Sequence, residues 1–383
     1  MTCYSVDQLQ NILANNVFNY TKDPKKAAGR ALGTMVEIIT FYLLKSWGLG
    51  QSLSIERSLA EYGNPDITHN VEYSLHPILQ QCEVFFSEKL PITSTKILSS
   101  IDKNVFSITR FEKSNNSLLT SDLILRNSCL IASSKELYSS HLVANLDFIS
   151  NDEYKIIISQ QYEKPYAIFE CKRVGIEEGI KKGPQSIEKA KQGAYVARML
   201  SSLQKVRMPS GELYGLIYKF NNEICIKPYA ELMAEIMESE NPSLLCDFIL
   251  TVGVVSNHGN WFTSDNHNKE LKVLAQSYDW LIFLTDKGLS EFINHILLDS
   301  ESNFEPVKEA FLESYNTKRK RTRFTKVQID YKADQTLQSY FNDNLIGVEN
   351  WFNVISPKDK SMQELKSQIF RLKDKNWKEI HSL

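Results

Sequence analysis

An apolar run that ends in two opposite charges lies near the middle of this chain, at residues 166–172 (YAIFECK). A short apolar run of this length predicts a buried β-strand, and so a fold that contains a sheet. Residues two apart on a strand point to the same face. Glu170 and Lys172 would therefore project side by side from the end of a rigid element.

Glu-x-Lys alone is a common pattern, and it also begins at Glu153, Glu270 and Glu364. The first of these follows polar residues and is typical of the edge of a turn. The other two lie in helical patterns, where residues i and i+2 do not face each other. Only Glu170 follows an apolar strand. A carboxylate there can hold a hard divalent cation, and the ammonium beside it can position water or balance phosphate charge.

The composition of the chain limits its partners and its location. At 383 residues it has room for two domains or one elaborated domain. The net charge of −2 means that nucleic-acid binding would need a local basic patch. The six cysteines are scattered, which favours reduced thiols. The sequence shows no secretory pattern and no apolar run long enough to cross a bilayer, so we expect a cytoplasmic protein with no membrane partner.

Hydrophobic periodicity predicts a mixed α/β chain. We expect helices over 27–47, 184–203, 269–284 and 289–298 and from Ser361, and strands over 52–59, 66–75, 141–149, 154–159, 166–172 and 248–256. A hairpin is expected over 213–227. The polar segment 239–243 is the best boundary between a core over 1–238, with an insertion at about 76–140, and a largely helical C-terminal domain over 239–383.

A second acid follows from the strand predicted over 141–149. Asp147 stands among apolar neighbours, where an unpaired carboxylate is costly, so it needs a partner. A metal shared with Glu170 would provide one. The alternative is an aspartate in a turn at the end of the strand, satisfied by backbone N–H groups.

The order of these elements resembles the PD-(D/E)xK nuclease superfamily, and within it a type II restriction endonuclease. The resemblance covers about residues 27–227: a helix bearing an acid, strands, an aspartate, an apolar strand ending in Glu-x-Lys, and a basic helix. It implies a restriction-endonuclease-like mixed sheet core flanked by helices. By this resemblance Asp147 and Glu170 would bind metal, Lys172 would position the attacking water, and Glu37 on the first helix would be an auxiliary catalytic acid.

The chain departs from the family pattern at the first acid. Leu146, not proline, precedes Asp147. The literal Pro-Asp pair ends at Asp66, and Asp122 is another competitor. We favour Asp147 because it needs only a short connection to Glu170.

The resemblance also implies an activity and partners. One or two Mg²⁺ ions would support sequence-specific cleavage of double-stranded DNA to 5′-phosphate and 3′-hydroxyl ends. Cleavage of palindromes favours a homodimer, and host protection would require a cognate DNA methyltransferase as a genetic partner. The alternatives are a structure-specific repair or recombination nuclease on the same core, and a DNA-binding protein without catalysis.

Two basic segments are candidates for contact with the DNA backbone. One precedes and lines the helix after the motif and contributes Lys181, Lys182 and Lys189. The other is the densest run of positive charge, formed by Lys318, Arg319, Lys320, Arg321 and Arg323 in the C-terminal part. That run also fits a nuclear-import tag or a solvated loop. A polar loop with His258 and His267 is a further candidate for base or phosphate contact.

Overall fold

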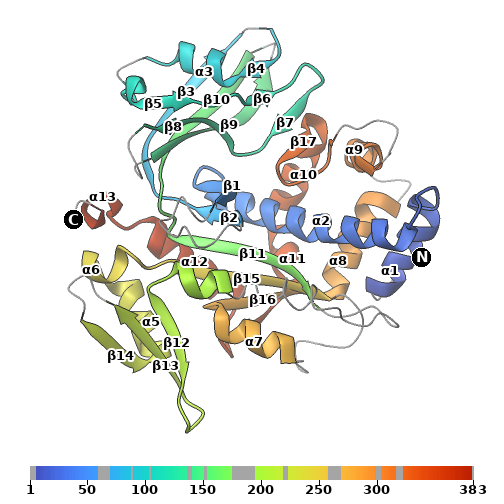
Figure 1. Ribbon diagram of the computed structural model, residues 1–383. Coiled ribbons are helices and arrows are strands. Elements are labelled where there is room, and N and C mark those ends of the chain that lie inside the picture. The colour runs from blue at the N-terminus through green and yellow to red at the C-terminus, as the bar shows by residue number, and fades with distance from the viewer. Residues whose placement is uncertain are drawn as a thin grey trace.

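The computed structural model shows a mixed α/β protein with several sheets (Figure 1). It describes residues 6–58, 70–87, 89–102, 105–135, 140–150, 153–174, 195–218, 223–257, 269–298, 303–315 and 322–381.

A six-stranded mixed sheet passes through the middle of the fold, in the order β1-β2-β11-β15-β16-β18. Its strands are β1 (Leu53–Ser58), β2 (Asn70–Leu75), β11 (Ala167–Val174), β15 (Leu250–Asn257), β16 (Trp280–Leu284) and β18 (Phe352–Ser356). β15 lies between β11 and β16 and runs parallel to both, whereas the other neighbours are antiparallel. β15 and β16 are buried along their whole length, as expected of parallel strands covered on both faces.

The long helix α2 (Pro24–Leu44) packs against β11 and confirms the predicted first helix. Asp23 caps it by accepting a hydrogen bond from the Lys26 N–H. The π-helical turn η2 (Lys45–Leu49) continues it. By length and composition alone, the helix over Pro24–Leu49 is long and apolar enough to cross a membrane. This corrects the expectation that the chain has no apolar run of that length. However, 67% of its most apolar window is buried inside the protein, and both the core helix of a soluble protein and a signal sequence near the N-terminus pass the same test.

Between β2 and β11 the chain makes an excursion that builds most of two smaller sheets (Figure 1). Their orders are β3-β10-β9-β8-β5 and β17-β7-β6-β4. The elements are β3 (Ile78–Phe86), β4 (Ile92–Thr93), α3 (Ser94–Ser100), η4 (Ile108–Arg110), β5 (Phe111–Lys113), β6 (Ser117–Leu119), β7 (Ile124–Arg126), β8 (Cys129–Ser134), β9 (Ser140–Ser150), β10 (Glu153–Tyr162) and, from the C-terminal part, β17 (Gln328–Asp330). The predicted strands over 141–149 and 154–159 are β9 and β10, and their sheet partners are each other, β3 and β8.

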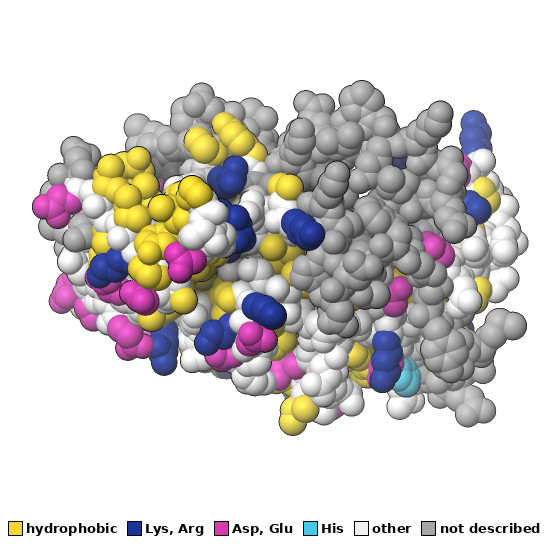
Figure 2. All heavy atoms as spheres, turned by 90° about the horizontal axis from the view of Figure 1, so that it is seen from below, with side chains coloured by type: hydrophobic (Ala, Val, Ile, Leu, Met, Phe, Trp, Pro, Cys, Tyr) yellow, Lys and Arg dark blue, Asp and Glu magenta, His cyan; other side chains and the backbone are white. Residues whose placement is uncertain are grey.

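A three-stranded antiparallel sheet follows, formed by β12 (Leu203–Arg207), β13 (Leu213–Tyr218) and β14 (Ile224–Pro228). Strands β13 and β14 confirm the predicted hairpin. Residues 195–200 are helical, as expected of the helix over 184–203, and 184–194 lie outside the described residues. The sheet carries exposed apolar side chains at Val206, Tyr218, Ile224 and Ile226. Figure 2 shows hydrophobic side chains gathered on this side of the molecule.

The remaining elements are helices, two before α2 and the others after β14. They are α1 (Val6–Ile12), η1 (Leu13–Val17), α5 (Tyr229–Glu238), α6 (Pro242–Leu245), α7 (Lys269–Ser277), α8 (Asp286–Ile293), η5 (Asn294–Leu298), α9 (Glu305–Tyr315), α10 (Tyr331–Asp343), α11 (Leu345–Glu349), α12 (Met362–Lys373) and α13 (Trp377–Ile380). The predicted terminal helix is α12, which Ser361 and Glu364 begin with a capping box. The helix predicted over 269–284 is wrong in its second half, where β16 pairs with β15.

The central sheet draws strands from both sides of the predicted boundary at 239–243. β1, β2 and β11 come before it, and β15, β16 and β18 come after it. The C-terminal part, expected to be largely helical, thus supplies half of the strands of this sheet.

Candidate active site

The candidate site lies where β2 and β11 separate. Their main-chain ladder ends at the pair formed by Tyr73 and Phe169. Beyond it β2 continues toward Asn70 beside β1, while β11 continues to Val174 beside β15. Diverging strands leave backbone groups that need other partners. The next residue on each strand is a glutamate, Glu72 on β2 and Glu170 on β11.

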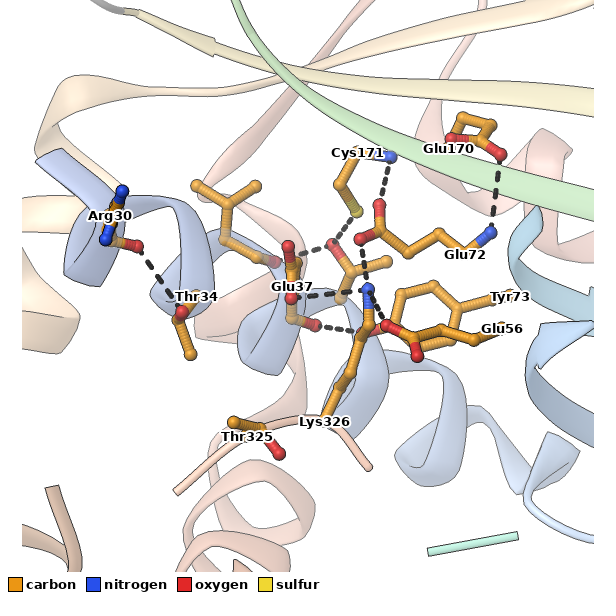
Figure 3. Close-up of polar contacts among 12 residues, drawn as sticks. Arg30, Thr34, Glu37, Glu56, Glu72, Tyr73, Glu170, Cys171, Thr325 and Lys326 are labelled. Atoms are coloured by element: carbon orange, nitrogen blue, oxygen red, sulfur yellow. Dashed lines mark hydrogen bonds and ion pairs between the residues drawn. The ribbon is translucent and has the colours of Figure 1, made fainter. Parts of the chain in front are cut away.

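The two glutamates replace the lost ladder bonds with side-chain bonds (Figure 3). The Cys171 N–H donates to Oε2 of Glu72 at 2.7 Å, and the Glu72 N–H donates to Oε1 of Glu170 at 3.3 Å. Glu170 is 2% exposed and Glu72 is 9% exposed. Glu72 therefore connects β2 to the predicted motif strand through both its backbone and its carboxylate.

Lys326 brings a second set of acids to the same place (Figure 3). Its Nζ contacts Oε1 of Glu72 and lies 3.3 Å from Oε2 of Glu37 and 3.3 Å from Oε1 of Glu56. Glu37 projects from α2, and its backbone carbonyl accepts a hydrogen bond from the Tyr73 hydroxyl at 2.7 Å. Three carboxylates from α2, β1 and β2 thus surround one buried ammonium group. We call the four acids Glu37, Glu56, Glu72 and Glu170 the carboxylate cluster.

The backbone of Glu56 is unusual. It lies on β1 between Ile55, which pairs with Tyr73, and Arg57, which pairs with Val71. A regular strand would turn its side chain to the face opposite Ile55. Glu56 instead has φ 53°, a left-handed conformation that is rare for a residue other than glycine. This irregularity allows its carboxylate to reach Lys326.

The shifted pKa values follow from burial and charge. Burial and the neighbouring Glu72 charge raise the pKa of Glu37 to about 8, although Lys326 opposes the shift. Burial alone would lower the pKa of Lys326, but the charges of Glu72, Glu37 and Glu56 outweigh it and raise that pKa. Burial, followed by the Glu170 and Glu72 charges, raises the pKa of the Tyr278 phenol. At neutral pH the cluster thus holds a charged Lys326 and a Glu37 that retains its proton.

Glu170 and Lys172 share one face of β11, because they are two residues apart. Cys171 between them faces α2, where its Sγ lies 3.5 Å from the Thr40 hydroxyl. The pair therefore points to the other side of the sheet from Glu37 and Lys326, and Glu72 joins the two sides. Lys172 is partly exposed at the end of the motif.

The carboxylate cluster suits a hard cation in its chemistry, because all of its acidic groups offer oxygen ligands of the kind that Mg²⁺ prefers. The distances between these oxygens and the atom they surround differ from those of a Mg²⁺ site. Oxygens at 3.3 Å from Nζ surround an ammonium, whereas Mg–O distances are about 2.1 Å. Among the described residues, no group of three or more His, Cys, Asp or Glu side chains could hold a metal ion as they lie. The oxygen donors are of the type that Mg²⁺ prefers, whereas their present spacing is that of a site for an ammonium group.

The structure places two of the three candidate first acids, Asp147 and Asp122, away from Glu170. Asp147 lies on β9 in the five-stranded sheet, where its carboxylate pairs with Lys155 at 3.2 Å and is 40% exposed. Asp122 lies in the turn between β6 and β7 and is exposed. Asp66 lies outside the described residues. The acid that contacts the motif strand is Glu72.

Most of the residues predicted to contact DNA lie outside the described residues. Lys181, Lys182, Lys189, Lys318, Lys320, Arg319 and Arg321 lie outside the described residues, as do His258 and His267. Arg323 is described, and its guanidinium pairs with Glu313 at 3.0 Å and Asp330 at 3.1 Å. It therefore supports the chain around β17.

Sequence reasoning missed Glu56, Glu72 and Lys326. Glu72 carried a usable signal, because it is a charged residue inside an apolar strand, the same argument that was applied to Asp147. Glu56 and Lys326 carried none, since one depends on an irregular backbone and the other comes from a distant part of the chain.

No family model matches the chain, and no curated protein or solved structure is similar to it by the comparisons made.

Proposed function

We propose that this protein is a Mg²⁺-dependent DNA endonuclease of the type II restriction class, with Glu72, Glu170 and Lys172 at its centre. The observation that carries the proposal is the junction of Glu72 and Glu170 where β2 and β11 separate, two residues before Lys172. It gives the Glu-x-Lys motif the second acid that metal-dependent cleavage requires.

The order of elements supports the same proposal. Along the chain come an acid-bearing helix (α2), two strands (β1 and β2), after the excursion the strand that contains Glu-x-Lys (β11), and then a helical segment at 195–200. The resemblance to the PD-(D/E)xK superfamily rests on a similar order, in which Asp147 was the acid before the motif strand. In this proposal Glu72 has the role first expected of Asp147, because among the described residues Glu72 contacts β11 and Asp147 does not.

Each residue has a distinct task in this proposal. Glu72 and Glu170 would hold the cation, which supplies a water of lowered pKa and stabilises charge on the scissile phosphate. Lys172, at the end of β11, orients water and offsets developing negative charge. Glu37 keeps a proton beside Glu72 at neutral pH, because burial disfavours its charged form. The backbone N–H of Cys171 holds the Glu72 carboxylate in place.

Digestion of plasmid DNA with and without Mg²⁺ tests the proposal. Discrete fragments whose sequenced ends carry 5′-phosphates and one common motif would support a restriction enzyme. Nicks or smears would instead favour a structure-specific repair nuclease. Intact DNA together with a gel shift would indicate a protein that binds DNA without cleaving it.

A further inference from the structure

Lys326 reaches the carboxylate cluster from the tip of a tight hairpin. Phe324 and Ile329 form a β-bridge, and between them the Thr325 N–H donates to the Gln328 carbonyl at 2.8 Å. The side chain of Lys326 is 8% exposed and passes over the Tyr73 ring, with Nζ 5.8 Å from its centroid. The hairpin thus inserts a single ammonium group between α2, β1 and β2.

The excursion anchors this hairpin. The Asn127 side chain donates to the Lys326 carbonyl at 3.0 Å, and the Asn127 N–H donates to the Val327 carbonyl at 2.9 Å. β17 contains the second arm of the hairpin and pairs with β7 just before Asn127. The backbone of Lys326 is therefore fixed, and only its flexible four-carbon side chain is free to withdraw from the carboxylates.

The charges around Nζ do not balance. Among the described residues, Lys326 brings one positive charge to the carboxylates of Glu56 and Glu72, and Glu37 beside them keeps its proton at neutral pH. An ammonium satisfies such a cluster only in part, and its contacts hold the oxygens too far apart for a metal ion. A divalent cation would bring more charge to the same oxygens at shorter range.

We propose that Lys326 is a positioning residue that serves as a built-in counter-cation, which a divalent metal must displace from the Glu72 carboxylate. This inference rests on the proposed function and adds a step to it. Without metal, Lys326 keeps the side chains of Glu37, Glu56 and Glu72 together and partly neutralises the charge of Glu56 and Glu72. When metal binds, the ammonium swings away while its hairpin stays fixed to β7.

Calorimetric titration of the full chain with Mn²⁺, without DNA, tests this competition. We expect Lys326→Gln to bind Mn²⁺ at least about tenfold more tightly than the wild type, because a competing positive charge is removed. Lys326→Arg keeps the charge and should stay within about threefold of the wild type. Glu72→Gln should abolish binding in either background, which locates the site. Equal or weaker Mn²⁺ binding by Lys326→Gln overturns the proposal, as does the absence of Mn²⁺ binding in all variants.

Amine labelling of the wild-type protein gives an independent readout that does not depend on a variant's folding. Acylation of Lys326, followed by mass spectrometry, should rise several-fold when Mn²⁺ is added. Lys375 is a matched control, since its buried Nζ bonds to the Met237 and Ser239 carbonyls. Unchanged labelling of Lys326 contradicts the displacement. If both readouts succeed while plasmid DNA stays intact with Mg²⁺, the displacement stands and the nuclease proposal fails.

Discussion

The amide of Cys171 donates to the Glu72 carboxylate at 2.7 Å, across the point where their two strands separate. This bond takes the place of a sheet hydrogen bond and holds an acid beside the Glu-x-Lys motif. The same separation that weakens the sheet therefore creates the site. A polar side chain that satisfies a backbone group in this way is costly to remove, because the buried N–H would lose its partner.

Lys172→Ala should retain DNA binding and lose cleavage. The lysine is proposed to orient water and offset charge in the transition state, and single groups of this kind are typically worth about 100-fold or more in rate. Cleavage is measured with Mg²⁺, and binding is measured by gel shift with Ca²⁺. Lys366→Ala, in the helical Glu-x-Lys of α12, is the matched control and should cleave normally. Full Mg²⁺-dependent activity in Lys172→Ala would remove this lysine from the mechanism.

Glu72→Gln and Asp147→Asn distinguish the two candidates for the first acid. We expect Glu72→Gln to lower the cleavage rate about 100-fold or more, because it removes the charge of a proposed metal ligand. The glutamine oxygen can still accept from the Cys171 N–H, so the fold should survive. Asp147→Asn should stay within about threefold of the wild type, since Asp147 pairs with Lys155 on another sheet. If Asp147→Asn cleaved far more slowly than Glu72→Gln, Asp147 and not Glu72 would be the first acid of the site.

Glu37→Gln should change how stability depends on pH in metal-free buffer. The pKa of Glu37 is about 8 in the folded protein and near 4.5 when unfolded, so the folded state binds more protons between these values. Its contribution is present below pH 4.5 and is lost as the pH rises through 8. Urea unfolding from pH 5 to 8 should show wild-type stability falling by up to about 1.4 kcal/mol per pH unit from this group. Glu37→Gln should remove that fall, and an unchanged slope would contradict the assignment.

Gly253→Ala should destabilise the protein beside the motif strand. Gly253 lies opposite Glu170 in the parallel pair of β15 and β11. An added Cβ would come within 2.8 Å of both the Leu281 and Tyr278 side chains. Overpacking of this kind costs about 1–3 kcal/mol, measurable by thermal or urea unfolding. Gly33→Ala is the control, because a Cβ there meets nothing within 4 Å on α2, and it should be neutral or stabilising by up to about 1 kcal/mol.

Local sequence patterns predicted the elements whose partners lie nearby or whose periodicity is strong. The spacing of α2, the turn of the β13–β14 hairpin and the Ser361 cap of α12 all carry such signals. The apolar run of β16 does not, because a strand buried on both faces has no alternation to separate it from a buried helix. Its assignment depends on pairing with β15, which no local pattern contains.

The same contrast applies to the site. Glu170 and Lys172 were found because two residues on one strand share a face, a rule that needs only local sequence. Glu72 lies 98 residues before Glu170, and Lys326 lies 254 residues after Glu72. These distances are closed by sheet pairing and by the hairpin docked on β7. Glu72 is unusual because it is a charged residue within an apolar strand. The local sequence around Lys326 does not predict its contact with the carboxylate cluster.

The position of Lys326 also bears on how the protein is made. A ribosome completes Glu37, Glu56, Glu72 and Glu170 long before it reaches the hairpin at 324–329. Until then the growing chain carries an acidic cluster that lacks its own ammonium, and β11 lacks its neighbour β15 for much of that time. Fragments that stop before the hairpin would keep the motif without its counter-charge. For a protein proposed to cut DNA, the finished arrangement would thus arise only after the hairpin has been made.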